Sequence, residues 1–234
     1  MDTRTNRRVF VALLALLLAT PALAVDGVIE INQARVLTGG ITSTDNPGFP
    51  VEIDQPGSYR LTSDLTVPSG YFGFVVHADN VTLDLNGFTV FGGGGATADG
   101  LALYTQKNIE IRNGTVREFS RTGIVAASGG SSVRVTDVRV VSNGAQGIDL
   151  QGGGSRVEGC TAVSNGNIGI KVDNGLVTGS VMRSNAAWGL AVTNLSGYGN
   201  NVITGNNGSE GAIQVAGAGI QIATNMCGTD TVCP

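Results

Sequence analysis

The sequence is poor in the side chains that most metal, cofactor and catalytic sites use. Only 5% of its 234 residues are aromatic and 14% are charged, and it contains one His, one Trp and three Cys. Two of the Cys residues, Cys227 and Cys233, lie near the C-terminus, without the further Cys or His that a zinc site requires. We therefore expect neither a metal site nor a cofactor.

Basic residues are also scarce. The sequence has 14 Lys and Arg against 18 Asp and Glu, which gives a formal net charge of −4. No run of basic residues is present that would neutralise a series of phosphates. An acidic chain of this kind is a poor partner for nucleic acid, so we expect no nucleic-acid partner.

Long apolar runs are missing too. The longest, Val9–Leu18, is too short to cross a bilayer and follows three Arg residues. Ala22-Leu23-Ala24 comes after it as a small-residue cleavage site. This order predicts a secretory signal peptide over residues 1–24, with a retained anchor as the alternative. We expect a secreted or periplasmic protein with no stable membrane span.

The apolar pattern lacks the 3.6-residue period of an amphipathic helix. Apolar residues instead alternate with other residues in short runs, inside a template that recurs every 20 to 27 residues or so. Each copy opens with Gly, an apolar residue, any residue and a second apolar residue, and most copies end with an Asn shortly before the next Gly. The copies open at Gly73, Gly100, Gly123, Gly147, Gly169, Gly189 and Gly211.

Aligned copies place apolar side chains in fixed columns, of which one holds Leu85, Ile111, Val135, Val157 and Val177. Columns in register predict coils stacked along one axis, with each strand pairing to its counterpart in the next coil. Three short strands per coil indicate an all-β fold, a right-handed parallel β-helix (a solenoid) of about six or seven coils. We interpret the glycines as turn residues with positive φ. The repeated Asn143, Asn165, Asn185 and Asn206 predict a ladder of stacked amides.

The copies also suggest boundaries. Residues 25–72 are predicted to form an irregular N-terminal cap with short strands at 51–53, 58–61 and 65–67, and residues 73–226 to form the β-helix. Residues 227–234 are predicted to close the C-terminal end with a Cys227–Cys233 disulfide, as fits an exported protein. Cys160 falls in an inward column, so we expect a buried free thiol. We expect a monomer.

One stretch carries a family resemblance. Val81-Thr-Leu-Asp-Leu-Asn-Gly-Phe-Thr-Val90, followed by Ile109-Glu-Ile-Arg-Asn-Gly-Thr-Val116 and by coils ending in Ser-Asn-Gly, resembles the bacterial secreted right-handed β-helix repeat proteins of the pectin-lyase-like group. The resemblance spans roughly residues 50–225. It implies a polysaccharide as partner, because the group contains polysaccharide lyases, glycoside hydrolases and uronan epimerases, besides members without known chemistry. The catalytic motifs of the polygalacturonases, mannuronan epimerases and pectate lyases are absent from this sequence.

The outward residues of the Gly-initiated strands supply the candidate site. Neighbouring strands lie about 4.8 Å apart, which predicts one polar patch of Asp149, Lys171, Gln151 and Asp173. We assign Lys171, Asp149 and Asp173 as candidate catalytic residues, with Lys171 neutralising charge. Gln151, Tyr104 and His77 are candidate substrate-binding residues. The alternative is a solvated Asp149–Lys171 ion pair, whose loss would change stability by less than about 1 kcal/mol.

A second face shows charges of both signs, and we expect Asp84, Glu110, Arg134 and Arg156 to share one column as a cross-strand ladder. Two functions remain open. The first is action on a polysaccharide, either lyase- or epimerase-like catalysis or glycan binding, through the Gly-initiated sheet. The second is a non-catalytic extracellular or surface module that has a structural or adhesive role.

Overall fold

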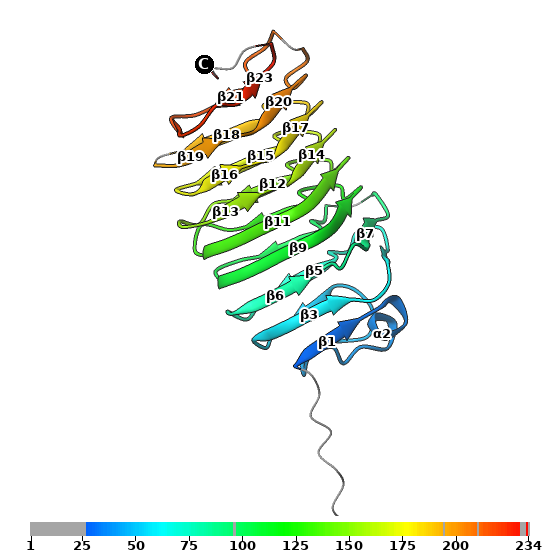
Figure 1. Cartoon of the computed structure of the whole chain (residues 1–234). Coiled ribbons are helices and arrows are strands. Elements are labelled where there is room, and N and C mark those ends of the chain that lie inside the picture. Colours follow the sequence, from blue (N-terminus) through cyan, green and yellow to red (C-terminus); the bar gives the residue numbers. More distant parts are fainter. Residues whose placement is uncertain (1–26, 96, 194, 210, 230–232, 234) are drawn as a thin grey trace, which may run out of the picture.

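The computed structural model describes residues 27–233 except 96, 194, 210 and 230–232. The predicted signal peptide therefore lies outside the described residues. The described chain forms two sheets in which every strand pairing is parallel. Figure 1 shows the strands stacked as coils from the N-terminal end to the C-terminal end.

The smaller sheet, called sheet B, takes one strand from each coil. Its eight strands follow one another in chain order, so they mark about seven turns from first to last. These strands are β2 (Val51–Ile53), β5 (Phe74–Val76), β8 (Leu101–Leu103), β10 (Ile124–Ala126), β12 (Ile148–Leu150), β15 (Ile170–Asp173), β18 (Leu190–Thr193) and β21 (Val215–Ala216).

The larger sheet, sheet A, has 15 strands and bends into two faces. Along its first face lie β1 (Val28–Ile31), β3 (Gly57–Leu61), β6 (Val81–Asp84), β13 (Arg156–Glu158), β16 (Leu176–Thr178), β19 (Gly197–Gly199) and β22 (Ile220–Gln221). Along the second lie β4 (Leu65–Val67), β7 (Thr89–Gly92), β14 (Thr161–Val163), β17 (Val181–Arg183), β20 (Val202–Thr204) and β23 (Met226–Cys227). The long strands β9 (Lys107–Arg117) and β11 (Ser131–Val141) run through both faces. The predicted all-β parallel solenoid is confirmed.

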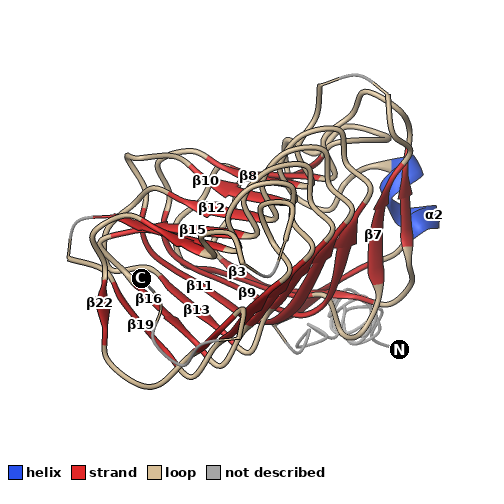
Figure 2. Ribbon diagram, turned by 90° about the horizontal axis from the view of Figure 1, so that it is seen from above, coloured by secondary structure: helices blue, strands red, loops and turns tan. Residues whose placement is uncertain are grey.

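Inward side chains of the two sheets form one continuous core. Figure 2 shows the strands of the two sheets on different sides of the stacked coils. Ile148, Leu150, Ile170 and Val172 on sheet B are all 0% exposed. Burying such a side chain contributes about 1.5–3 kcal/mol, whereas ordering each backbone residue costs about 1–2 kcal/mol. A coil of some 20 residues therefore depends on its neighbours, which complete both the burial and the hydrogen bonds.

The template glycines are required for a reason other than the expected one. Gly147 and Gly169 are not among the positive-φ residues. A Cβ on Gly147 would lie 2.5 Å from the carbonyl oxygen of Gly169, and one on Gly169 would lie 2.6 Å from that of Gly189. Each template glycine thus lets the next coil approach, and any side chain there would push the coils apart. The expectation of positive φ holds for turn glycines such as Gly154, Gly159 and Gly179, but not for these two template glycines.

Positive φ occurs instead at the corners where the strands bend. In β11 and just beyond it, Ser132, Asp137 and Ser142 have φ of 56°, 53° and 54°. In β9 and just beyond it, Asn108 and Asn113 have φ of 56° and 59°. Small polar side chains tolerate this conformation better than others. The recurrence of Asn, Ser, Asp and Gly five residues apart therefore sets the bends of each coil.

The predicted Asn ladder is confirmed. Asn165 Nδ2 donates to Asn185 Oδ1 at 2.9 Å and to the Val140 carbonyl oxygen at 3.2 Å, while its Oδ1 accepts from the Asn143 side chain at 3.1 Å. Gln214, which sequence reasoning missed, ends the ladder: its Oε1 accepts from Asn206 Nδ2 at 2.9 Å. Every amide in this buried row is satisfied, so each coil binds the next through side chains as well as backbone.

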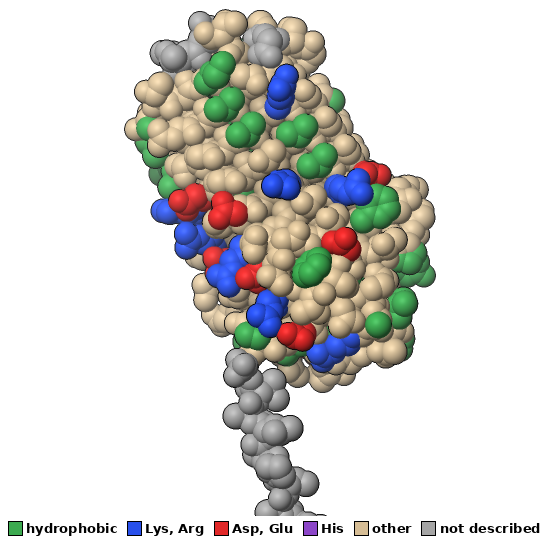
Figure 3. Space-filling view, turned by 45° about the vertical axis from the view of Figure 1, so that its right-hand side comes forward, with side chains coloured by type: hydrophobic (Ala, Val, Ile, Leu, Met, Phe, Trp, Pro, Cys, Tyr) green, Lys and Arg blue, Asp and Glu red, His purple; other side chains and the backbone are tan. Residues whose placement is uncertain are grey.

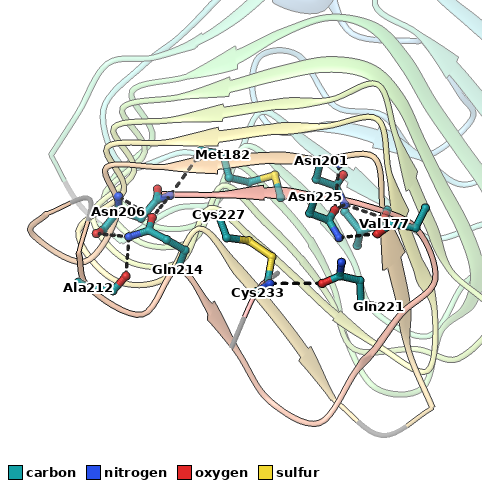
Figure 4. The surroundings of a disulfide bond; sticks show 11 residues. Val177, Met182, Asn201, Asn206, Ala212, Gln214, Gln221, Asn225, Cys227 and Cys233 are labelled. Carbon is teal, nitrogen blue, oxygen red and sulfur yellow. Dashed lines mark hydrogen bonds between the residues drawn. A yellow bond between two sulfur atoms is a disulfide. The ribbon is translucent and has the colours of Figure 1, made fainter. Parts of the chain in front are cut away.

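A second, shorter ladder lies at another corner. The Ser180 and Asn201 backbone N–H groups donate to the side-chain oxygens of Asn201 and Asn225, each at 2.9 Å. Figure 4 shows the ends of both ladders on either side of the Cys227–Cys233 disulfide, whose Cα atoms are 5.4 Å apart. Cys233 also packs against the core. The C-terminal end of the solenoid is thus closed by two amide ladders and a covalent bridge.

The solenoid begins earlier than the predicted boundary at residue 73. β2 pairs with β5, β3 with β6 and β4 with β7, in the same arrangement as the later coils. The expected short strands are present, but they form a full coil rather than a cap. The N-terminal end is covered instead by β1 and the short helix α2 (Gln33–Thr38), whose Val36 is 0% exposed.

One predicted register is also wrong. Eight residues separate Val81 from Thr89, whereas six separate their partners Ile109 and Thr115. The two additional residues, Asn86 and Gly87, form a turn at the corner. Leu83, not Leu85, therefore pairs with Ile111, and Asp84 pairs with Arg112 instead of Glu110.

We predict that Asn165→Ala destabilises the protein by about 2–4 kcal/mol, because it leaves buried amide and carbonyl groups without partners. Urea unfolding followed by far-UV circular dichroism measures the change. Asn167→Ala is the matched control, since Asn167 is exposed on the adjacent turn and should alter stability by less than about 0.5 kcal/mol. Equal effects of the two substitutions would contradict the structural role of the ladder.

We also predict that the native protein shows no reactive thiol, and that the denatured, unreduced protein shows one. Cys160 is 1% exposed, and burial raises the pKa of its thiol to about 12. The thiolate is the reactive form, so raising the pH from about 8 to about 10 should not bring Cys160 into reaction while the fold persists. Thiol counting with an aromatic disulfide reagent tests this. A thiol that reacts in the native state, or three thiols after denaturation, would contradict the assignment.

Candidate functional site

Three of the predicted site residues meet on the outer side of sheet B. Asp149 on β12 pairs in register with Lys171 on β15. Lys171 Nζ lies 3.2 Å from Asp149 Oδ1, and Gln151 Nε2 donates to Asp149 Oδ2 at 3.1 Å. The strand spacing that predicted this contact therefore holds for Asp149, Lys171 and Gln151, which we call the sheet B cluster.

Asp149 is far more buried than an outward surface position suggests. The residue is 5% exposed, and the Lys171 side chain is 25% exposed. Asp149 Oδ1 is buried and lies within ion-pair distance of Lys171 Nζ, but it accepts no hydrogen bond. The pair is not solvated on both sides, which contradicts the alternative of an exposed surface ion pair. The more accessible member of the pair is Lys171.

The remaining predicted residues lie apart from this cluster. Asp173 is on the same strand as Lys171 but accepts a hydrogen bond from the Thr193 hydroxyl. Among the described residues, Lys171 therefore has one close carboxylate partner, Asp149.

His77 and Tyr104 follow neighbouring strands near the N-terminal end of sheet B, because Val76 pairs with Leu103. His77 Nε2 is 4.0 Å from Glu52 Oε1, and Tyr104 is 48% exposed. β10 separates the strand before Tyr104 from the one before Gln151. A ligand that contacts Lys171 and these two residues together would have to extend along several coils.

Sequence reasoning missed an exposed aromatic side chain at the turn into β18. Trp188 comes directly before Gly189 and β18, the strand that pairs with the Lys171 strand, and it is 38% exposed. The position before each template glycine provided the signal, since it is polar or buried in most other copies: Thr122 Oγ1 is 3.2 Å from Gln146 Oε1, and Ile168 is 8% exposed, while Phe72 is half-buried. Among the described residues at this position, Trp188 is the one exposed ring, and it can stack on a flat ligand.

Sheet A carries paired charges on its first face. Arg112 Nε is 3.1 Å from Asp84 Oδ2, and Arg134 Nη2 is 3.4 Å from Glu158 Oε2. Figure 3 shows charged side chains gathered over the N-terminal coils of the view and hydrophobic ones over the C-terminal coils. Glu110, Arg134 and Arg156 share one column as predicted. Asp84 lies in the adjacent column, where it pairs with Arg112.

Two hollows open on sheet A, and neither is lined by the sheet B cluster. One is lined by Val28, Ser58, Tyr59, Arg60, Thr82, Asp84 and Arg112, and the other by Gly87, Asn113, Gly114, Thr115, Asp137 and Arg139. In the described part of the chain, no three His, Cys, Asp or Glu side chains gather as a metal site would require. None of the described helices is long and apolar enough to span a membrane.

Comparison with family models agrees with this architecture. The model described as "right handed beta helix region" matches residues 44–175 and 72–230, two overlapping stretches that cover most of the chain. The chain belongs to this right-handed β-helix family. The match includes β2–β4, which supports their place as a coil of the β-helix. Searches of curated proteins and of solved structures found no match.

We predict that Lys171→Ala lowers the free energy of unfolding by about 1–3 kcal/mol, because the nearly buried Asp149 carboxylate loses its counter-charge. The earlier expectation, a change below about 1 kcal/mol, applied to an exposed pair. Chemical denaturation provides the measurement, and Lys107→Ala is the control because Lys107 is the other Lys of the sequence and is exposed. A loss no larger than that of the control would show that water compensates Asp149 fully.

Proposed function

We propose that this protein is an exported β-helix that binds a polysaccharide along the outer face of sheet B. The observation that carries the proposal is the Asp149–Lys171 ion pair on the outward side of sheet B, in which the lysine side chain is 25% exposed. An ammonium has three donor hydrogens, so Lys171 can contact Asp149 and still donate to a sugar oxygen. Export rests on the sequence pattern of residues 1–24.

Each residue of the proposed site has a role. Lys171 neutralises Asp149 and donates to a sugar oxygen, Gln151 orients the carboxylate, and Trp188 stacks on the apolar side of a sugar ring. Because the Lys171 ammonium is paired with the Asp149 carboxylate, Lys171 is better suited to hold a hydroxylated ligand than to remove a proton. The arrangement favours binding over lyase- or epimerase-like turnover.

A second function is supported by a separate observation. Several outward positions on other strands of sheet B carry small apolar side chains with little accessible surface. Val75, Ala102 and Ala191 are 7%, 2% and 6% exposed. Such a smooth face also fits a rigid extracellular module that has no small-molecule site. The two functions differ in whether Lys171 and Trp188 contact a ligand.

The proposal predicts that the mature protein binds at least one member of a panel of neutral and acidic polysaccharides. Trp188→Ala, and separately the paired change Asp149→Asn with Lys171→Met, should each weaken that binding about tenfold or more, through lost stacking or lost hydrogen bonds. The paired change removes both charges together, so neither is left without its partner and the fold is preserved. Affinity electrophoresis measures binding, and absorbance of unsaturated products reports any lyase activity.

Lys107→Met is the matched control, since Lys107 begins β9 on sheet A, away from sheet B. It should bind as the parent does. If no polysaccharide of the panel binds, or if the site variants bind as well as Lys107→Met, the sheet B site does not exist and the structural module is the better assignment.

A further inference from the structure

The hollow beside Arg139 is made by the two additional residues in the corner before β7. Asn86 and Gly87 extend that corner, and Gly114 lies at the same corner of the next coil. A Cβ on Gly114 would lie 2.3 Å from Leu85 Cβ, so position 114 is restricted to glycine. The floor of the hollow is therefore backbone, while Asn113, Thr115, Asp137 and Arg139 provide polar side chains around it.

Arg139 differs from most other arginines of the described chain. Six of them, Arg60, Arg112, Arg117, Arg121, Arg134 and Arg156, lie within 4.0 Å of an acidic side chain. Among the described residues Arg139 has no such partner. Arg183 on β17 also lacks one, as does Arg35, which donates instead to two backbone carbonyl oxygens. Arg139 thus keeps all its guanidinium donors for solvent or a ligand, next to a hollow of suitable polarity.

Further donors face the same space. Thr115 pairs in register with Arg139, so their side chains stand on adjacent strands about 4.8 Å apart. Asn113 Nδ2 makes one long hydrogen bond, 3.4 Å to Asp84 Oδ1, and its second N–H is left over. A hydroxyl, an amide and a guanidinium together form a set of donors suited to oxyanions.

Asp137 also lines the hollow and limits the ligand. Its Oδ1 fills the space above Gly159, 2.4 Å from where a Cβ of that residue would be, so this oxygen is directed toward the following coil. Thr115, by contrast, lies on the preceding coil. The carboxylate does not neutralise Arg139, but it disfavours a doubly charged anion and can accept a hydroxyl hydrogen.

We propose that this hollow binds a carboxylate, free or carried by an acidic sugar, with Arg139 as the principal contact and Thr115 and Asn113 as further donors. The site is on sheet A and does not depend on the sheet B cluster.

Titration of the full mature chain with sodium acetate and with sodium glucuronate, followed by NMR or calorimetry at low salt, tests the proposal. Arg139→Ala should weaken binding about tenfold, as expected for loss of a charge-assisted hydrogen bond, and Thr115→Val should weaken it less. Arg183→Ala is the matched control, an exposed arginine of sheet A that lines no part of this hollow, and it should bind as the parent does.

The comparison of ligands identifies the source of the carboxylate. Tighter binding of glucuronate than of acetate supports an acidic sugar whose hydroxyls reach Asp137, and equal binding supports a simple carboxylate. Far-UV circular dichroism confirms that each variant keeps its β structure. Failure of both ligands to bind at millimolar concentration, or equal weakening by Arg139→Ala and Arg183→Ala, overturns the proposal.

Discussion

The close stacking of one coil on the next is the constraint on which the rest of this structure depends. Parallel strands about 4.8 Å apart require that nothing project between successive coils at the turn into sheet B. The template glycines meet this requirement, since a Cβ on Gly147 would lie 2.5 Å from the next coil's carbonyl oxygen. The amide ladder beside them uses the same spacing, with Asn143, Asn165 and Asn185 linked by side-chain bonds of 3.1 and 2.9 Å. The template glycines and the ladder asparagines thus both follow from the short distance between successive coils.

The same spacing explains where polar chemistry can appear. A residue on the outer side of a coil lies within reach of the residue above and below it, so charges interact by column. On sheet A this yields neutralising pairs such as Arg112 with Asp84. On sheet B, where most outward neighbours are small, Asp149 is nearly buried and depends on a single Lys. Asp149 is thus more desolvated than the paired carboxylates of sheet A, since its side chain is 7% exposed against 20% for Asp84 and 42% for Glu158.

Departures from the regular repeat produce local features that the regular coils do not have. The insertion of Asn86 and Gly87 shifts a register and borders a hollow, where Arg139 forms no ion pair although Asp137 lines the same space. The longer amide ladder ends at Gln214, which accepts from Asn206, and the shorter one ends at Asn225, which accepts from Asn201. Because the regular coils are so alike, a departure of one or two residues is the simplest way for this fold to create a distinct local surface.

The sequence by itself determined the fold class, the inward columns and the Asn ladder, because stacked coils repeat the same local environment and so repeat the same residue types. It also placed Asp149 beside Lys171, since a fixed period converts sequence alignment into strand register. Only the tertiary structure decided that Asp149 is buried, that Asp173 bonds Thr193 instead of Lys171, and that Arg139 borders a hollow. Burial and side-chain pairing depend on how neighbouring coils curve and where a corner is lengthened. The alignment of copies does not contain that information, because its period is the same for a smooth face and for a hollow one.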